Sequence, residues 1–314
     1  MTFSSATRVF VAGDLGMVGS ALVRALRERG AKQIITSKRN ELDLRNEEAV
    51  GAFLRGQQPE IVMMAAARIG GITAYRESPA DFLYDNIAMQ NAVIRQSWST
   101  GVRQLVLLGS ATVYPRDAPQ PMKEEYFLSG PLEPTVEPYA IAKIAGIRMS
   151  QAFHAQHGLG VLNPLPSNLY GTNDNYDPRR SQVVASLIKR FCDAADSDAS
   201  EVVVWGSGNA RREFLHVDDC AEAILFLTER WASPEIINVG SGEDVSIREL
   251  ASLIAKQSGY SGRIIWDTSK PDGAPRKWLD SSRLRSLGFR PRIALEDGIA
   301  MTVAEYRKRR GDVS

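Results

Sequence analysis

Tyr139 and Lys143 lie four positions apart, a spacing that places two side chains on one face of a helix. An ammonium held beside a phenol favours the phenolate, which brings proton exchange with a carbonyl oxygen closer to neutral pH. Ser110 follows a strand-like run and offers a hydroxyl that can hydrogen-bond the same oxygen. We therefore predict that Ser110, Tyr139 and Lys143 are catalytic and deliver a proton to a ketone. A Tyr-x-x-x-Lys spacing alone is more often a solvated helix surface, so this prediction depends on the elements around it.

A glycine-rich loop near the N-terminus is the first of these elements. A strand-like run at 8–12 meets Gly13, Gly16 and Gly19, and the apolar pattern of a helix follows at 21–26. Such glycines allow a tight turn and let a pyrophosphate approach the amino end of the helix, where free amides and the helix dipole favour negative charge. We predict that the whole loop binds a dinucleotide; its members are Gly13, Asp14, Leu15, Gly16, Met17, Val18 and Gly19. A structural loop with no nucleotide is the alternative.

The second predicted strand ends in basic residues. NAD sites usually carry an acidic residue at this point to bind the ribose hydroxyls, whereas here Lys38 and Arg39 follow Ser37. Cations suit a 2′-phosphate, and a guanidinium can hold it through two hydrogen bonds, so Arg39 is the stronger candidate. The expected cofactor is therefore NADP(H). Two solvated basic residues are the alternative.

Strand-like and helix-length segments alternate through the first half of the chain. Strands are expected at 33–36, 61–66, 105–109 and 160–165, and helices at 81–99 and 139–157. This alternation predicts an α/β fold with a Rossmann-type doubly wound parallel sheet covered on both faces. A Gly-, Asn-, Asp- and Pro-rich stretch at 171–178 marks the crossing into a smaller C-terminal α/β substrate-binding domain.

The expected domains are residues 1–170, with 215–238 packing back on them, and residues 171–314. In the second domain, helices are expected at 181–195, 217–229 and 294–308, with a strand at 201–205. Ser246 and Glu249 form a capping box that opens a helix ending near Gln257. Asp218 and Asp219 are expected to cap the helix that follows His216.

Composition excludes several classes of protein. The 314 residues are 44% hydrophobic and 24% charged, as in a globular protein with a large core. The 38 Lys and Arg nearly cancel the 37 Asp and Glu, so no overall field would attract nucleic acid or an anionic membrane. No signal peptide or spanning segment is expected, and a cytoplasmic location follows. Cys192 and Cys220 lack the spacing of metal ligands, so we expect both thiols reduced and no metal site.

The chain resembles the GDP-L-fucose synthases, extended short-chain dehydrogenases also called GDP-4-keto-6-deoxymannose epimerase-reductases. The resemblance covers nearly the whole sequence. Its most specific runs are EPYAIAKIAGI at 137–147, VVWGSG at 203–208, REFLHVDD at 212–219 and SKPDG at 269–273.

The resemblance implies a cofactor, partners and binding residues. NADPH would be the hydride donor, a GDP-linked 4-keto sugar the substrate, and a second copy the partner in a homodimer joined through helices of the first domain. Its implied cofactor contacts, besides Lys143 and the glycine loop, are Leu108, Gly109, Pro166, Asn168 and Leu169. Its implied GDP-sugar contacts are Arg190, Trp205, Arg212, Asp272 and Lys277.

Each of these contacts makes chemical sense and has an alternative. Arg190, Arg212 and Lys277 can balance a diphosphate, and Trp205 offers a flat apolar surface. Trp205 after three valines could instead belong to the core, and Arg212 beside Arg211 could lie in a solvated turn.

Two positions depart from the family pattern. The family inverts two carbons beside the ketone with a cysteine and a histidine before it reduces the ketone. Thr112 stands at the cysteine position and Gln182 at the histidine position. A threonine hydroxyl is too weak an acid to serve unaided as a carbon base, and a glutamine amide does not titrate. We expect both residues to contact substrate without an epimerase role.

These departures favour an NADPH-dependent C4-ketoreductase of a GDP-4-keto-6-deoxy hexose or heptose that performs no 3,5-epimerisation. Its product would be manno- or talo-configured, for example GDP-rhamnose, for a surface polysaccharide. The first alternative is a bifunctional fucose synthase whose acid and base have moved; the candidate replacements are Asp174, Asp177, Glu124 and Lys123.

Three further alternatives stay open. The run SATVY at 110–114 is similar to one in nucleotide-sugar 4-epimerases, but those enzymes recycle NAD, which Lys38 and Arg39 disfavour. A 4,6-dehydratase would need a carboxylate beside Ser110, and Ala111-Thr112 supplies none. An idle NADP-binding sensor would be free to lose Tyr139 and Lys143, which are both present.

Overall fold

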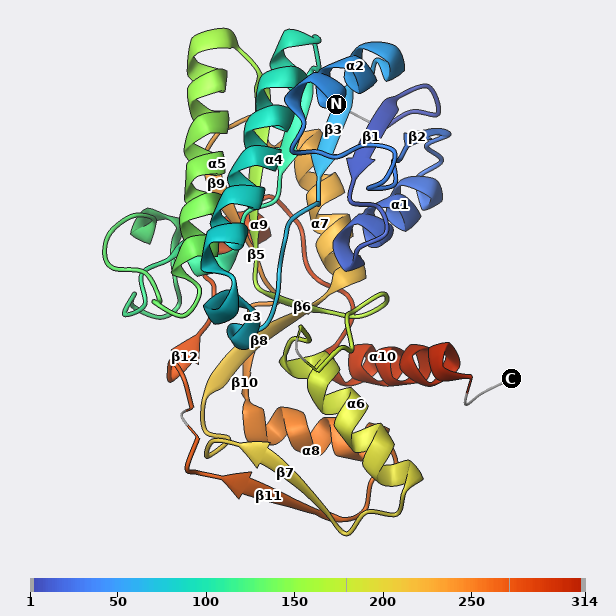
Figure 1. Cartoon of the computed structure of the whole chain (residues 1–314), viewed down its shortest axis with the longest axis vertical. Helices are drawn as coiled ribbons and strands as arrows, with labels where there is room; N and C mark the ends of the chain where they lie inside the picture. The colour runs from blue at the N-terminus through green and yellow to red at the C-terminus, as the bar shows by residue number, and fades with distance from the viewer. Residues whose placement is uncertain (1–2, 179, 271, 312–314) are drawn as a thin grey trace.

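The protein folds into two lobes that lie one above the other in Figure 1. The structure, a computed structural model, describes residues 3–178, 180–270 and 272–311. The upper lobe is built on a six-stranded sheet and the lower lobe on smaller sheets. Pro271, part of the run at 269–273, lies outside the described residues.

The upper sheet is parallel throughout, with strand order β2-β1-β3-β4-β5-β9. The strands are β1 (Arg8–Ala12), β2 (Gln33–Ile35), β3 (Ile61–Met64), β4 (Gln104–Leu107), β5 (Gly160–Pro166) and β9 (Ile236–Val239). Every residue of β3 and β4 is buried, as expected when helices cover both faces of a parallel sheet. The predicted doubly wound sheet is confirmed.

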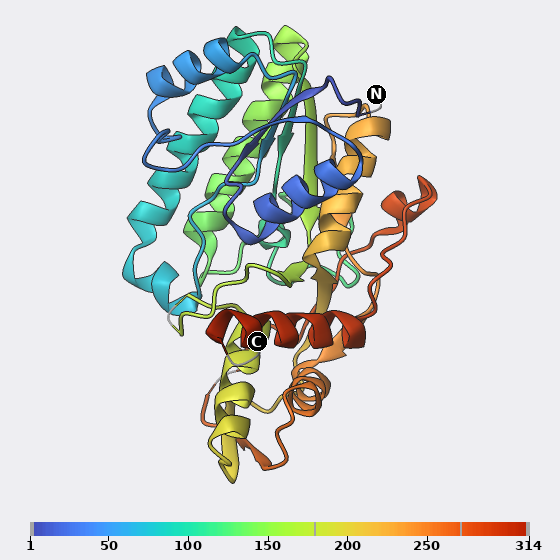
Figure 2. The same cartoon turned by 90° about the vertical axis from the view of Figure 1, so that its right-hand side faces the viewer.

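Helices cover this sheet on both faces, as the view in Figure 2 shows. They are α1 (Met17–Glu28), α2 (Glu47–Gln57), α4 (Pro79–Ser99), α5 (Glu137–His157) and α7 (Val217–Arg230). Successive side chains of a strand point to opposite faces. Val9 and Val11 therefore join the core beneath α1 and α7, whereas Phe10 packs with residues of α2 and α4.

The strand order reverses between β1 and β3, and this reversal opens the crevice in which such sheets bind ligands. The loop after β1 and the loop after β3 meet there. Gly13 has φ +90°, and any side chain on it would collide with the backbone of Ala66. A side chain on Gly19 would likewise collide with the backbone of Gly13. These two glycines are thus required for the turn and for the close approach of the two loops.

The lower lobe is a smaller α/β unit, as predicted. Its elements are β6 (Asn168–Tyr170), α6 (Val183–Asp196), β7 (Glu201–Trp205), β8 (Arg211–His216), β10 (Asp244–Ser246), α8 (Ile247–Gln257), β11 (Arg263–Asp267), β12 (Arg276–Lys277) and α10 (Leu295–Arg310). β8 pairs with β6, β10 and β12, and β7 pairs with β11. The capping box of Ser246 and Glu249 is confirmed. Phe191, Phe214 and Ile254 belong to the core beneath the helices.

Four short elements complete the chain, and the cap of α7 differs from the prediction. The short elements are α3 (Ile72–Glu77), η1 (Ala111–Val113), η2 (Glu124–Tyr126) and α9 (Ser282–Ser286). His216 itself caps α7 by accepting a hydrogen bond from the Asp218 amide, at 3.3 Å. Asp219 instead accepts the amides of Arg292 and Ile293, because the segment leading to α10 passes over this end of the helix.

Cys192 and Cys220 are buried free thiols, as expected. Across the described ranges, no cluster of three or more His, Cys, Asp or Glu is arranged to hold a metal ion. No helix in the same ranges combines the length and the apolar character needed to cross a membrane.

Candidate active site

Ser110, Tyr139 and Lys143 meet at the carboxyl end of β4. Tyr139 and Lys143 lie in the first turns of α5 and are 7% and 4% exposed. The Lys143 ammonium donates a hydrogen bond to the Leu108 carbonyl, with 2.7 Å between Nζ and O. Nζ lies 5.8 Å from the centroid of the Tyr139 ring. Helix α5 and the end of β4 thus hold phenol and ammonium side by side inside the protein.

Hydroxyl groups connect Thr112, Ser110 and Tyr139 in a row. Ser110 is the N-cap of η1 and accepts hydrogen bonds from the Thr112 amide, at 3.3 Å, and from the Thr112 hydroxyl, at 3.0 Å. The Ser110 hydroxyl in turn hydrogen-bonds the Tyr139 phenol. Because Thr112 donates to Ser110, the proton of Ser110 is left to point toward Tyr139 or a ketone beside it.

The pKa of Tyr139 differs from the expectation. Burial raises the pKa of the phenol above its ordinary value, the nearby Tyr75 raises it further, and the hydrogen bond from Ser110 lowers it. The ammonium of Lys143 does not reverse this effect, because it is directed to the Leu108 carbonyl. Burial also lowers the pKa of Lys143 to about 8. Tyr139 therefore holds its proton at neutral pH, the state required of an acid.

Tyr75 is a neighbour that the sequence analysis missed. Its ring centroid lies 5.7 Å from that of Tyr139 and 4.5 Å from that of Phe82. Its hydroxyl accepts a hydrogen bond from the Gly70 amide at 3.4 Å. Nothing in the local spacing of Tyr75 relates it to Tyr139. The small side chain of Ala67, just after β3, packs against the cluster that contains both rings.

The glycine loop fits a bound pyrophosphate. Gly16 is the N-cap of α1 and has no side chain to satisfy the first amides of the helix. The Gly16 amide donates to the Gly13 carbonyl at 3.0 Å, which closes the turn. Asp14 Oδ1 is buried with no hydrogen-bond partner among the described residues, and burial raises the pKa of this carboxyl. Free amides beside an unpaired polar atom are features of a site that a ligand completes.

The other predicted cofactor residues border the same crevice. Leu108, Gly109 and Pro166 are buried at the carboxyl ends of β4, which lies beside β3, and of β5, which follows β4 in the sheet. Leu169 and Asn168 lie in β6, and the Asn168 amide donates to the Glu213 carbonyl at 2.8 Å.

Lys38 and Arg39 lie just beyond the end of β2, which pairs with β1. Both side chains are exposed, and neither forms a salt bridge within the described part of the chain. They are free to meet an anion near the end of the glycine-loop strand.

Gln182 contacts the loop that follows β3. It is the N-cap residue of α6, and its amide donates to the Gly70 carbonyl at 3.2 Å. Gly70 also contacts Tyr75, so Gln182 is connected through this loop to the aromatic residues around Tyr139.

The remaining predicted substrate residues belong to the lower lobe. Trp205 ends β7 and is 68% exposed, so it is not a core residue. Asp272 accepts hydrogen bonds from the amide and the hydroxyl of Ser207, at 2.6 and 2.7 Å. Arg212 and Lys277 are register partners on β8 and β12, so Arg212 lies in a strand and not in a solvated turn.

Three cations of this lobe form no salt bridge within the described residues, although Asp272 acts on Arg212 and Glu133 on Lys277 as more distant charges. Arg190, Arg212 and Lys277 are half-buried, and burial lowers the pKa of each. The charge of Arg212 lowers the pKa of Lys277 further. No salt bridge of these three occurs in residues 3–178, 180–270 and 272–311. Arg212 and Lys277 lie side by side and are partly shielded from water. Such a pair of like charges destabilises the empty site and favours the binding of an anionic ligand.

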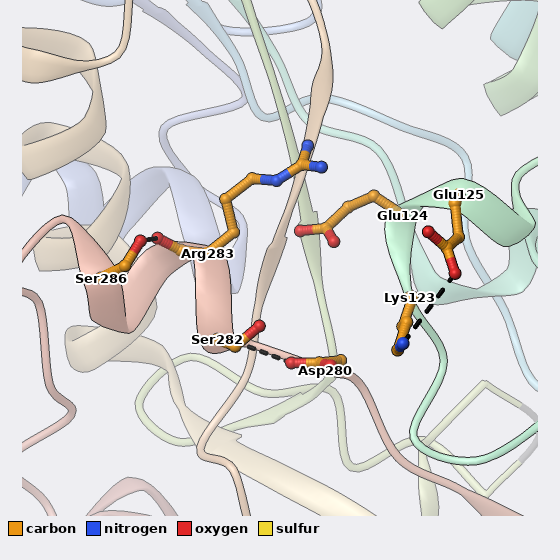
Figure 3. A pocket seen from close by; sticks show the side chains of 7 residues that line it. All are labelled: Lys123, Glu124, Glu125, Asp280, Ser282, Arg283 and Ser286. Carbon is orange, nitrogen blue, oxygen red and sulfur yellow. Dashed lines mark hydrogen bonds and ion pairs between the residues drawn. The ribbon is translucent and has the colours of Figure 1, made fainter.

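A cavity of about 370 Å³ lies apart from these residues, near η2 and α9, and is shown in Figure 3. Lys123 pairs with Glu125, while Arg283 and Glu124 face one another across the opening. None of the predicted catalytic or binding residues lines this cavity. The structure thus separates Lys123 and Glu124, two of the proposed replacement acids and bases, from the catalytic residues.

The comparisons with known proteins agree with this geometry. Residues 9–240 match the model of the NAD dependent epimerase/dehydratase family. The chain is 47% identical to the GDP-L-fucose synthase of Escherichia coli (strain K12), over 95% of this chain and 96% of that protein. The chain belongs to the GDP-L-fucose synthase group of that family. The resemblance noted in the sequence is confirmed, and the protein is an oxidoreductase of the short-chain dehydrogenase type.

Two solved structures add a second group of relatives within this family. One is described as a GDP-6-OMe-4-keto-L-xylo-heptose reductase from C. jejuni; it has TM-score 0.92 and 32% identity, and the match covers 98% of this chain and 100% of that one. The other is described as a GDP-mannoheptose C4 reductase from Campylobacter jejuni with NADP bound, with TM-score 0.89, 34% identity and coverage of 97% and 99%. The chain is thus similar both to fucose synthases and to C4 reductases.

Proposed function

We propose that the protein uses NADPH to reduce the 4-keto group of a GDP-linked 4-keto-6-deoxy sugar. The observation that carries this proposal is the cluster of the partly exposed Ser110 with the buried Tyr139 and Lys143 beside the crevice of the sheet. The fucose synthases and C4 reductases among the relatives support it, because both names describe chemistry on GDP-linked sugars.

In this proposal the side chains handle the proton. Bound NADPH supplies the hydride. Tyr139, which keeps its proton at neutral pH, donates it to the carbonyl oxygen as that oxygen becomes an alkoxide. Ser110, oriented by Thr112, donates a hydrogen bond to the same oxygen. Lys143 stabilises the phenolate that remains.

The residues present fit NADP(H) on one side of the crevice and a GDP-sugar on the other. The glycine loop would receive the cofactor pyrophosphate and Arg39, with Lys38, the 2′-phosphate. Arg190, Arg212 and Lys277 would neutralise the diphosphate of the substrate, and the exposed face of Trp205 would pack against a ring of the ligand. Asp272 would contact the ligand beside Trp205.

The second candidate is a complete fucose synthase that also inverts the carbons flanking the ketone. The identity to GDP-L-fucose synthases, 47% for the E. coli protein, supports this candidate better than the reductase without epimerisation. It requires an acid and a base other than Thr112 and Gln182. Asp174 is buried against α10, where Arg309 donates to its carbonyl, and Asp177 is exposed in the turn before α6.

The local chemistry supports reduction alone. The Thr112 hydroxyl is already engaged with Ser110, and the Gln182 amide with the Gly70 carbonyl. Neither group titrates in the range needed to remove a proton from carbon. The two Campylobacter jejuni reductases with similar folds are named for reduction only.

Deuterium exchange tests the proposal and separates its two forms. The protein is incubated in deuterated water with GDP-4-keto-6-deoxymannose, first without NADPH and then with it, and the products are assigned by NMR. Reduction alone gives NADPH oxidation with no deuterium at C3 or C5. Deuterium at either carbon would establish the epimerising form. The E. coli fucose synthase, run in parallel, is the positive control and should give this result. No NADPH oxidation with any GDP-4-keto sugar would refute both.

We also propose a cytoplasmic homodimer formed through α4 and α5. Tyr84, Trp98 and Ile141 on these two helices are 71%, 40% and 41% exposed. Large apolar side chains exposed on one helix pair are typical of a surface that another copy covers.

A further inference from the structure

The small sheet of the lower lobe carries two sets of cations on opposite faces. β12 consists of only two residues, and its register with β8 places Arg276 opposite Arg211 and Lys277 opposite Arg212. Because side chains alternate along a strand, Arg211 and Arg276 share one face, and Arg212 and Lys277 share the other.

One carboxylate binds both cations of the first face. Asp244, on β10, accepts hydrogen bonds from Nε of Arg276 at 2.6 Å and from Nε of Arg211 at 3.2 Å. A second nitrogen of Arg276 binds its other oxygen at 2.9 Å, so that contact is bidentate. The Asp244 side chain is only 6% exposed. Three strands are thereby joined by one ionic cluster, in which the carboxylate is buried and the side chains of Arg211 and Arg276 are 40% and 41% exposed.

On the other face, no salt bridge to Arg212 or Lys277 occurs among the described residues, and Asp272 and Glu133 act on these two cations only as more distant charges. The charges of Arg212 and Lys277 oppose one another, and β12 pairs with β8 through two residues only. The bond between Asp244 and Arg276 therefore opposes the separation of the two free cations. Bidentate Arg–carboxylate geometry also fixes orientation, which a single point charge does not.

We infer that Asp244 is a positioning residue, which clamps Arg211 and Arg276 so that Arg212 and Lys277 stand side by side for the diphosphate of the nucleotide. This inference rests on the proposed function, since it assumes that the two free cations bind a nucleoside diphosphate. Asp244 itself would not touch the ligand.

A second anchor makes the inference testable without loss of the fold. Glu213, on β8, accepts the Leu279 amide at 3.0 Å and the Gly242 amide at 2.8 Å. It therefore keeps the segment after β12 in place when Asp244 is replaced. Glu249 provides the matched control, because it also contacts Arg211, at 3.4 Å, but does not reach Arg276.

The test measures GDP binding by titration calorimetry in the presence of NADPH, for the wild type, Asp244→Asn and Glu249→Gln. We expect the Kd of GDP to rise about tenfold in Asp244→Asn, as when one charge-assisted hydrogen bond is lost, and to stay unchanged in Glu249→Gln. The KM of the GDP-sugar should rise with it, while kcat and the KM of NADPH stay unchanged.

The sign of the effect separates positioning from simple electrostatics. Removing a negative charge strengthens the general attraction for a diphosphate, so a purely electrostatic role predicts tighter binding. Unchanged or tighter GDP binding in Asp244→Asn would overturn the inference. Should that variant fail to fold, Arg276→Lys keeps the charge but loses the bidentate contact, and unchanged binding there would overturn it equally. A wild type that does not bind GDP would refute the proposed function instead.

Discussion

The proposed catalytic centre and the proposed nucleotide-binding residues are built in opposite ways. Tyr139 and Lys143 are 7% and 4% exposed, on a 21-residue helix packed against a buried sheet. Trp205 is 68% exposed, and Lys277 lies on a strand of two residues. The groups that move a proton are enclosed and held by helix and strand ends, whereas the groups for the nucleotide lie on short, accessible elements.

This difference separates chemistry from recognition. Enclosed dipoles and charges act strongly on a developing alkoxide because water does not screen them. Accessible cations and aromatic faces must instead admit and release a charged ligand. Changes in the first region should therefore reduce kcat, and changes in the second should mainly raise the KM of the nucleotide sugar.

The largest expected effect tests the enclosed region. Tyr139→Phe removes the proton donor while keeping the ring, and we expect kcat to fall about a thousandfold, within the range for loss of a general acid. NADPH binding, measured by fluorescence titration, should be retained. Tyr75→Phe is the control, because Tyr75 contacts the same ring but its hydroxyl only accepts from the Gly70 amide. Equal losses in the two variants would contradict the assignment of Tyr139.

A pH profile sharpens the role of Lys143. Burial lowers its pKa to about 8, so the ammonium is present below that pH and is lost as the pH rises through it. We expect kcat for reduction to decline above pH 8 by about tenfold per unit, as for one ionisation. Arg remains charged throughout, so Lys143→Arg, though slower, should lack this decline. A decline at the same pH in both proteins would assign it to another group.

The smallest effect is expected in the accessible region. Trp205→Ala should raise the KM of the GDP-sugar about fivefold, the size expected for one aromatic contact at an exposed site, with kcat unchanged. Met301→Ala is the control, since that exposed apolar side chain lies on α10, which carries none of the predicted binding residues. A large fall in kcat for Trp205→Ala would show that the two regions are not separable.

Local sequence patterns were sufficient to predict the helices and strands that hold Tyr139 and Lys143. The buried runs of β3 and β4, the glycine turn before α1 and the spacing of Tyr139 and Lys143 all involve residues close in sequence. The same reasoning predicted neither α2 nor β8, and it left open whether Arg212 contacts the substrate or lies in a solvated turn. Burial of Arg212 depends on β10 and β12, which follow it in the chain by more than thirty and sixty residues.

The amino-acid sequence by itself determined the doubly wound sheet, the glycine-rich turn after its first strand, the Tyr–Lys pair and the absence of a titrating group at Thr112 and Gln182. Periodicity, turn chemistry and side-chain type are properties of the chain alone. Only the tertiary structure decided the raised pKa of Tyr139, the anchoring of Lys143 on the Leu108 carbonyl and the division of cations between two faces of the small sheet. These depend on desolvation and on contacts between distant segments, which no local spacing encodes.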